Sequence, residues 1–327
     1  MRTLLDHLNL KLPIWSAGMG GGLAGPALVA AVCEAGGLGV LGAGAAPGPL
    51  ISAWIAQTRA LTSRPFGANI ILPMSDGSDV EACFDARVPV LVLFWGDTQP
   101  YVNDAHKRGM FVVAQCGGPD DAVAAADAGV DAVIVQGVEA GGHVKALAPL
   151  TSTVAAAVKV LGQVPVIAAG GIATGEDIAT ALALGAQATS LGTRFVASLE
   201  AAAFTDYKQR IVQAVASDTV MTTLFDIGWP DANHRVIRNT TYERWEAAGK
   251  PVSGERPGEK QDVGEQLLGH HRLVLQRYSV MPPLSGFDGD LDAMALYAGE
   301  SVERIKDIAP AGLVVERLLD ELRRAVN

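Results

Sequence analysis

Charged residues are scarce in this chain. Lys, Arg, Asp and Glu make up 18% of its 327 residues, against about 25% in an average soluble protein. A disordered chain combines many charges with few apolar residues, and the 49% hydrophobic content excludes that class. The 37 glycines and 17 prolines follow no three-residue period, which excludes a collagen-like chain.

Among the charged residues, basic ones are fewer than acidic ones. The chain has 25 Lys and Arg against 35 Asp and Glu, for a net charge of −10. Nucleic-acid partners require a basic face, and anionic membranes attract basic segments. We therefore expect neither a nucleic-acid partner nor a membrane partner. Any anionic ligand has to be held by local donors.

Cysteines and long apolar runs are also few. Cys33, Cys83 and Cys116 are odd in number and lack close spacing, which favours a reducing cytosol over a disulfide framework. Charged residues interrupt positions 1–20, so we expect no signal peptide. No uncharged apolar run is long enough to span a membrane. These features predict a cytoplasmic protein.

Short apolar runs alternate with Ala-rich stretches of helical spacing. Runs that end in Gly or a polar residue indicate strands buried on both faces. The eight predicted strands are Leu12–Ser16, Gly39–Gly44, Phe66–Leu72, Pro89–Trp95, Met110–Cys116, Asp131–Gly137, Val164–Gly170 and Ala188–Gly192. The predicted helices are Pro26–Ala35, Pro49–Leu61, one around Ala105, Asp120–Ala128, Thr151–Leu161 and Glu176–Leu184.

Eight strands with helical crossovers predict an α/β fold of the (β/α)8 TIM-barrel type over residues 1–198. A doubly wound open sheet is the alternative, although it needs fewer strands and one Gly-rich loop after the first. Residues 199–290 are richer in charge, aromatics and Pro, and we expect a mainly helical cap there. Residues 291–327 are predicted to return to the barrel and end in a packed helix.

Glycines at the ends of predicted strands seven and eight indicate a phosphate site. Gly170 and Gly171 follow strand seven, while Gly192 and Thr193 follow strand eight. In barrels these two loops often bind phosphate through bare N–H groups and a helix N-terminus. The alternative is that these glycines only form tight turns.

A histidine follows two glycines at the end of predicted strand six, in the segment Gln136–His143. We expect His143 to be mobile, exposed to the pocket and able to titrate near neutral pH. It could then abstract a proton, donate one or stabilise an anion. The alternative is a loop histidine with a surface hydrogen bond. Glu139 in the same segment is equally compatible with a solvated loop.

The first predicted strand runs into a Gly-rich loop that begins Ala17-Gly18-Met19. Small residues there let a flat ring system lie against the backbone, although an ordinary turn is the alternative. Asn69 and Gln115 could direct amides towards the same mouth. We predict no metal site, because the adjacent residues His270 and His271 diverge on a helix.

These motifs, in this order, resemble the nitronate monooxygenase family (formerly 2-nitropropane dioxygenase), and the resemblance covers nearly the whole chain. It rests on Pro13, Ile14 and Met19, and on the segments 66–69, 136–143, 169–172, 192–195 and 294–299. It implies a flavin mononucleotide (FMN) barrel that oxidises small alkyl nitronates, and in some cases nitroalkanes, with O2. The products would be a carbonyl compound and nitrite.

The resemblance also implies roles for matching residues. The flavin ring would lie on Ala17, Gly18 and Met19, and Asn69 and Gln136 would touch the ring or the ribityl chain. The phosphate would be held by Gly170, Gly171, Gly192 and Thr193, while Tyr297, Ala298 and Gly299 would close the site. His143 would be the active-site base or the partner of the anion.

Two departures from the family pattern bear on the substrate. Lys145 stands where the family usually has Gly, and Trp95 stands where many members have Ser-Phe-Gly. We expect both residues, together with Trp229 of the cap, to shape the substrate pocket.

Other functions stay open at this point. An NAD(P)H-dependent FMN reductase of the quinone or enoyl-thioester type is the main alternative, with NAD(P)H in place of O2 as the redox partner. A flavin-free barrel with a cysteine nucleophile and a non-catalytic flavin-binding protein are further ones. The sequence leaves both a monomer and an oligomer open.

Overall fold

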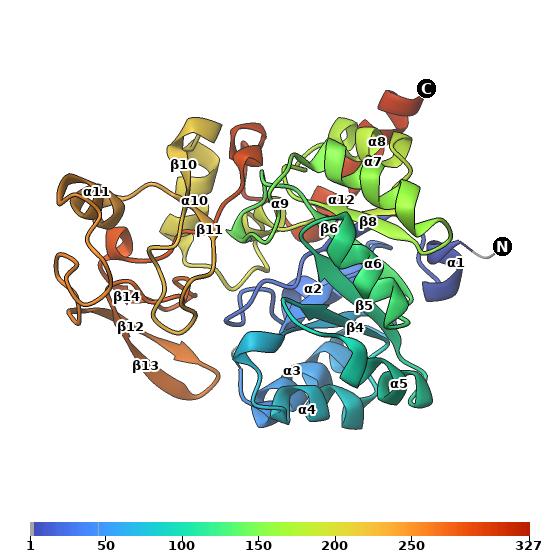
Figure 1. Ribbon diagram of the computed structural model, residues 1–327, viewed down its shortest axis with the longest axis horizontal. Helices are drawn as coiled ribbons and strands as arrows, with labels where there is room; N and C mark the ends of the chain where they lie inside the picture. Colours follow the sequence, from blue (N-terminus) through green and yellow to red (C-terminus); the bar gives the residue numbers. More distant parts are fainter. Residues whose placement is uncertain (1–2, 45) are drawn as a thin grey trace.

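Eight parallel strands form the closed core of the computed structural model, which describes residues 3–44 and 46–327 (Figure 1). The sheet order is β1-β9-β8-β6-β5-β4-β3-β2, and a bridge between Trp15 and Leu38 joins its two ends. The strands are β1 (Ile14–Ser16), β2 (Val40–Gly42), β3 (Gly67–Ile71), β4 (Val90–Phe94), β5 (Phe111–Cys116), β6 (Ala132–Gln136), β8 (Val166–Ala169) and β9 (Ala188–Leu191). The predicted (β/α)8 barrel is confirmed.

Helices surround this barrel. They are α1 (Leu4–Leu8), α2 (Pro26–Glu34), α3 (Gly48–Leu61), α4 (Ser78–Ala86), α5 (Gln99–Lys107), α6 (Pro119–Asp127), α7 (Leu150–Leu161), α8 (Gly175–Ala183), α9 (Thr193–Val196) and α12 (Ala311–Val326). The Ala-rich stretches predict α2, α3, α5, α6, α7 and α8, whereas α1, α4 and α9 were not predicted. None of the helices in the described residues is long and apolar enough to span a membrane.

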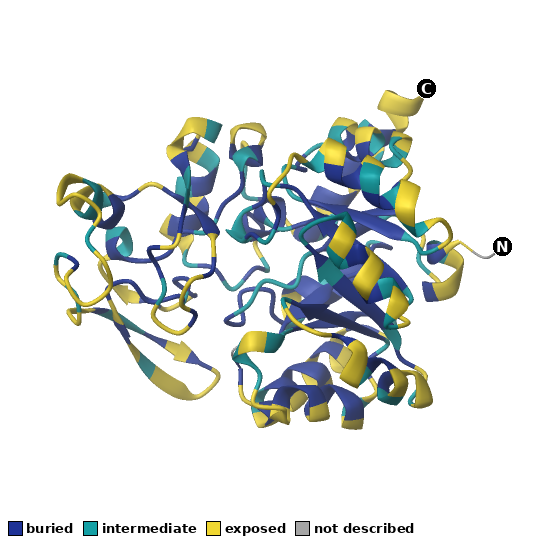
Figure 2. Ribbon diagram, viewed as in Figure 1, coloured by how far each residue is buried: buried dark blue, intermediate teal, exposed yellow. Residues whose placement is uncertain are grey.

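The strands are buried on both faces, which explains their continuous hydrophobicity. In β4, Val90 and Val92 belong to the cluster inside the barrel, whereas Leu91 and Leu93 face the helices. The alternation follows from the two-residue period of a strand. Figure 2 shows the buried strands inside partly exposed helices.

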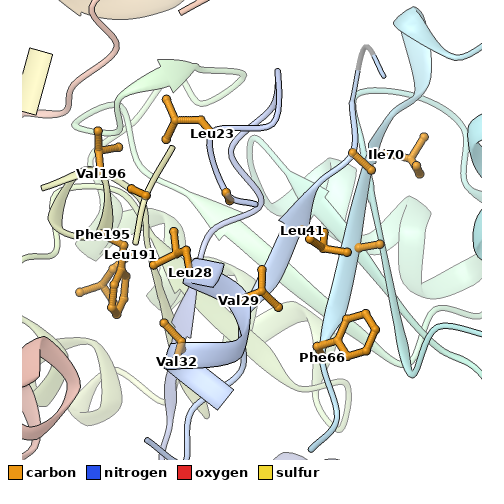
Figure 3. Close-up of a cluster of buried hydrophobic side chains, with 14 of the residues drawn as sticks. Leu23, Leu28, Val29, Val32, Leu41, Phe66, Ile70, Leu191, Phe195 and Val196 are labelled. Atoms are coloured by element: carbon orange, nitrogen blue, oxygen red, sulfur yellow. The ribbon is translucent and has the colours of Figure 1, made fainter. Parts of the chain in front are cut away.

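The outer layer of the core is formed where helices cover strands. Figure 3 shows Leu28 and Val32 of α2 directed towards Leu191 and Phe195 of the β9–α9 segment. Removing such a side chain costs its transfer free energy plus a cavity term. This packing fixes the β9–α9 turn that carries the predicted phosphate loop.

The C-terminal helix α12 packs against α8 and α2. Val314, Leu318 and Leu322 lie at helical spacing and are buried. Glu321 also accepts a hydrogen bond of 2.8 Å from the N–H of Gly175, the first residue of α8. The return of the chain to the barrel is as predicted, whereas the limits 1–198, 199–290 and 291–327 stay a prediction.

The cap differs from the expected mainly helical region. It holds α10 (Thr205–Gln213), η2 (Ala216–Asp218) and α11 (Thr240–Ala247), together with β10 (Thr219–Thr222), β11 (His234–Ile237), β12 (Asp262–Leu268), β13 (His271–Gln276) and β14 (Asp288–Gly289). Two short helices, η3 (Leu291–Ala293) and η4 (Glu300–Arg304), follow. The cap forms the left side of Figure 1.

The cap strands belong to two small sheets, ordered β10-β11-β7 and β13-β12-β14. The short runs at 219–222 and 234–237 contain the β-branched residues typical of strands. Strand β7 (Gly142–His143) comes from the barrel segment after β6, so it joins the first sheet to the barrel mouth. Our helical interpretation of the cap was therefore wrong in detail.

We predict that Gly42→Ala destabilises the fold, because a Cβ at this position would lie 1.7 Å from the Met19 carbonyl oxygen. The loop after β1 has to move, and overpacking of this kind costs about 1–3 kcal/mol. Urea unfolding measures the loss. Gly312→Ala is the matched control: it has open space and lies within α12, so it should stabilise by about 0.5–1 kcal/mol. Equal stabilities for the two variants would contradict this account.

Candidate active site

A cavity of about 180 Å³ opens at the carboxyl ends of the barrel strands. Loops after β1, β6, β8 and β9 form its walls, with residues from the cap and the return segment. Most predicted site residues meet there: Ala17, Gly18, Met19, Asn69, Gln136, His143, Gly170, Gly171, Gly192, Thr193 and Tyr297. This is the face on which barrel enzymes carry their active sites.

One corner of the cavity is lined by backbone and hydroxyl groups. Gly170 and Gly171 have φ values of +102° and +69°, which glycine adopts without strain. The N–H groups of Gly171 and Gly192 donate to no other described residue. The Thr193 hydroxyl accepts a hydrogen bond of 3.0 Å from the Gly299 N–H, and Ser301 lies alongside. Such a set of donors suits an anionic group.

The opposite wall follows the loop after β1, where backbone lies close to side chains of β3. A Cβ at Gly18 would lie 2.3 Å from the Cβ of Asn69, so only glycine fits. The buried Asn69 amide donates to the Val92 carbonyl at 3.4 Å. Gln115 also lines the cavity. Because Gly18 has no side chain, a ligand can approach the backbone of this wall closely.

His143 is held by its backbone on two sides. Strand β7 pairs it with His234 of β11. The buried Gln136 side chain accepts from the Lys145 N–H at 3.1 Å and donates to the His143 carbonyl at 3.0 Å. Gln136 therefore positions the histidine segment as well as lining the cavity. The expectation that His143 is mobile was wrong.

The His143 ring lies among other rings. Its centroid is 4.0 Å from that of Trp229, with an interplanar angle of 19°, and 5.2 Å and 5.5 Å from those of His234 and Tyr297. The Nε2 atom is buried and has no hydrogen-bond partner among the described residues. An unpaired polar atom in a buried place is costly unless a ligand satisfies it.

Burial lowers the pKa of His143 from 6.5 to about 3, and the neighbouring His234 lowers it further. We had expected it to titrate near neutral pH, and this is also wrong. The physical reason is that the cap covers the ring, since desolvation disfavours the charged imidazolium. His143 is neutral throughout the physiological range.

The second histidine, His234, is entirely buried and has both ring nitrogens satisfied. Its Nε2 accepts from the Phe225 N–H at 3.2 Å, so Nδ1 carries the proton and donates to the Ala232 carbonyl at 2.9 Å. Burial lowers its pKa to about 4. His234 is therefore a satisfied residue of the interior.

Two residues predicted for the substrate pocket lie outside it. Within the described chain, neither Trp95 nor Lys145 lines the cavity. Lys145 turns away because its Nζ pairs with Asp121 at 2.8 Å. Trp95 instead packs edge-on against Trp229, with centroids 5.2 Å apart.

Ala298 and Gly299 lie behind the wall instead of lining it. A Cβ at Gly141 would meet the backbone of both at 2.4 Å. The Glu300 N–H donates to the Glu139 carbonyl at 3.0 Å in the same contact. The return segment therefore supports the loop that precedes His143, and Tyr297 alone of the three predicted residues reaches the cavity.

Trp229, the third residue expected to shape the substrate pocket, does line the cavity. Several other lining residues were not predicted, among them Tyr207, Met281 and Ser301. They carry no local signal, because their positions depend on how the cap and the return segment fold onto the barrel. The Tyr207 hydroxyl, for example, donates to the Tyr297 carbonyl.

The three cysteines are free and buried. Burial raises the pKa of Cys33 to about 11 and those of Cys83 and Cys116 to about 12. A thiolate nucleophile needs a lowered pKa. The geometry therefore disfavours the cysteine-nucleophile alternative.

A family model described as Nitronate monooxygenase matches residues 2–89 and 75–321 of this chain. A nitronate monooxygenase of Paraburkholderia phytofirmans is 34% identical over an alignment of 272 positions that covers 68% of this chain and 73% of that protein. A second relative, from Mycobacterium tuberculosis, is 36% identical over 254 residues, and the match covers 76% of this chain and 70% of that protein. It is named as a (3aS,4S,5R,7aS)-5-hydroxy-7a-methyl-1-oxo-octahydro-1H-indene-4-carboxyl-CoA dehydrogenase.

Solved structures resemble the chain over its full length. FabK from Thermotoga maritima has a TM-score of 0.81 at 33% identity, covering 100% of this chain and 97% of that chain. Nitroalkane oxidase from Streptomyces ansochromogenes has a TM-score of 0.79 at 30% identity, and the match covers 99% of this chain and 98% of that chain. Sequence identity alone therefore does not separate these activities.

We predict that the protein loses stability as the pH falls from about 6.5 towards 4. His143 and His234 have lowered folded-state pKa values, so between these limits the unfolded chain binds more protons. Each such histidine contributes a slope of up to about 1.4 kcal/mol per pH unit. Urea unfolding at pH 7, 6 and 5 measures it.

The variant His143→Gln should show a shallower acid-dependent loss than the wild type. His270→Gln serves as the control, because His270 is exposed. If His143→Gln and His270→Gln follow the same pH dependence, His143 is not a buried neutral group.

Proposed function

This chain belongs to the nitronate monooxygenase family of flavin-dependent oxidoreductases, and from that premise we propose that it uses FMN and O2 to oxidise alkyl nitronates to a carbonyl compound and nitrite. The observation that carries the proposal is the unpaired, buried Nε2 of His143 in the cavity. A ring nitrogen without a partner is free to donate a hydrogen bond to a bound substrate or to accept one from it, and a nitronate offers oxygen atoms for such a bond.

The cavity fits FMN by the chemistry of its walls. Gly171, Gly192, Thr193 and Ser301 would hold the phosphate with N–H and hydroxyl groups. The wall at Gly18, where no Cβ fits, would contact the flavin ring of FMN. Bound FMN would supply the electron acceptor for oxidation of the substrate carbon.

His143 would bind the nitro group of the substrate through Nε2. An opposite charge within a few ångströms raises the pKa of a histidine, so a bound nitronate favours the imidazolium that stabilises it. The same histidine is a poor base before substrate arrives, because burial lowers its pKa to about 3. We therefore propose nitronates, which are already deprotonated, in preference to neutral nitroalkanes.

A second candidate is an NAD(P)H-dependent FMN reductase that acts on a quinone or an enoyl thioester. The observation that favours it is the similarity to a relative named as an octahydro-1H-indene-4-carboxyl-CoA dehydrogenase, whose substrate is a CoA thioester. Both candidates use the same cavity and the same flavin, and they differ in which molecule reduces it.

We predict that the protein binds FMN, and that an alkyl nitronate bleaches its visible absorption within seconds under anaerobic conditions. NADH and NADPH should bleach it slowly or not at all. An absorption titration with each reductant in parallel measures this. Fast bleaching by NADH or NADPH alone would favour the reductase, and a protein that takes up no added FMN would contradict both candidates.

We predict that His143→Gln keeps bound FMN and loses turnover of nitronates by about 100-fold or more, the usual contribution of a positioned proton-transfer or hydrogen-bonding side chain. The flavin content is measured from the absorption spectrum and turnover from nitrite release. The exposed His270→Gln variant is the matched control. Unchanged turnover in His143→Gln would exclude the role that we assign to it.

A further inference from the structure

The cap places one large aromatic ring directly on His143. Trp229 is only 6% exposed and lines the cavity. Its ring lies nearly parallel to the imidazole, with centroids 4.0 Å apart. Stacking of aromatic rings contributes free energy beyond the burial of their area. Trp229 thus restrains the histidine from the cap side.

The loop that carries Trp229 is fixed at both ends by His234. The Phe225 N–H donates to its Nε2, and its Nδ1 donates to the Ala232 carbonyl. Between these points the Trp229 N–H donates to the Asp226 carbonyl at 3.0 Å. Gly228 has a φ of +106°, which permits this tight turn. The loop is therefore a tight turn held in place by His234, which is neutral and has both ring nitrogens hydrogen-bonded.

An arginine buried beneath the loop holds the same turn from the other side. Arg256 donates to the Asp226 carboxylate at 2.8 Å and to the Leu224 carbonyl at 3.0 Å. Glu259 and the ring of Tyr278 complete its environment. Breaking a buried ion pair by removing one partner is strongly destabilising, so this cluster fixes the loop in one arrangement.

The barrel supports Trp229 from below. Trp95 and Phe94, at the end of β4, contact its ring edge-on at centroid distances of 5.2 Å and 6.3 Å. Trp95 has a φ of +63°, which is uncommon for a residue other than glycine. The departure from the family pattern at Trp95 thus acts on the site through Trp229.

We propose that Trp229 is a positioning residue for the proposed oxidation: its stacked indole fixes the plane of the His143 ring at the wall of the cavity. The expected change in kcat rests on the proposed function, whereas the restraint of the His143 ring does not. The other groups that face the His143 ring are His234 from β11 and Tyr297 from the return segment, and Gln136 from β6 fixes its backbone.

The test compares Trp229→Phe, which keeps an aromatic ring to stack, with Trp229→Leu, which keeps apolar bulk without one. With an alkyl nitronate as substrate, Trp229→Phe should retain kcat within about threefold. Trp229→Leu should lose kcat by about 10-fold to 100-fold, since small misplacements of a reacting group have effects of this size. KM should change much less in both variants, because the lost interaction is one of orientation.

A second readout requires no substrate. In the holoenzyme with 13C-labelled histidine side chains, the His143 signal is identified by its loss in His143→Gln. It should not shift between pH 5.5 and 8 in the wild type or in Trp229→Phe. In Trp229→Leu it should shift with pH, because water then reaches the ring. Trp245→Leu is the matched control, since Trp245 lies in α11 and does not line the cavity.

The outcomes separate the two proposals. If nitronates fail to reduce the wild-type flavin while the histidine signal behaves as described, the proposed function fails and the positioning role stands. If Trp229→Leu keeps the wild-type kcat and a pH-independent His143 signal, the positioning role is excluded. If Trp229→Leu does not fold, Trp229→Phe provides the test. This variant must keep the wild-type kcat and a His143 signal that does not shift with pH, and the loss of either overturns the proposal.

Discussion

Closure of the barrel is the constraint on which the rest of the structure depends. The bridge between Trp15 and Leu38 joins strands at the two ends of the sheet order, and the backbone bonds around it complete the ring of strands. Only in a closed barrel do the loops after β1, β3, β6, β8 and β9 meet around one cavity. The corner at Gly171, Gly192 and Thr193 and the opposite wall at Gly18 exist because these loops converge.

The cap gives that cavity its electrostatic character. It buries His143 and His234 so deeply that both are neutral, while the chain as a whole carries a net charge of −10. Long-range attraction therefore does not bring an anion to the site. Affinity for an anion has to arise at short range, from N–H groups and from the proton that an imidazole accepts once the anion is present.

Much of the fold could be predicted because strands buried on both faces have a simple signature. All eight barrel strands and the C-terminal helix follow from apolar runs and glycine positions. The position of Gly171 and Gly192 at the cavity follows as well, since both lie at the ends of predicted strands, whereas their binding of a phosphate stays a prediction. The helix α4 was missed because its sequence, SDVEACFDA, is short and mixes charges with apolar residues.

Features that depend on contacts between distant segments could not be predicted. The direction of Lys145 is decided by Asp121, and the burial of His143 by a cap residue 86 positions later in the chain, Trp229. Strand β7 has only two residues and owes its existence to pairing with β11. Sequence patterns report local periodicity, whereas these features require the tertiary arrangement.

The hydrogen bond from the Gly299 N–H to the Thr193 hydroxyl links two distant parts of the molecule. Thr193 belongs to the corner proposed to hold the phosphate, and Gly299 begins the segment that leads through η4 to the terminal helix α12. Ligands that bind only the folded form stabilise whatever they hold together. Occupation of that corner would therefore protect the last thirty or so residues from local opening, hydrogen exchange and proteolysis, and the C-terminus would report on cofactor loading from a distance.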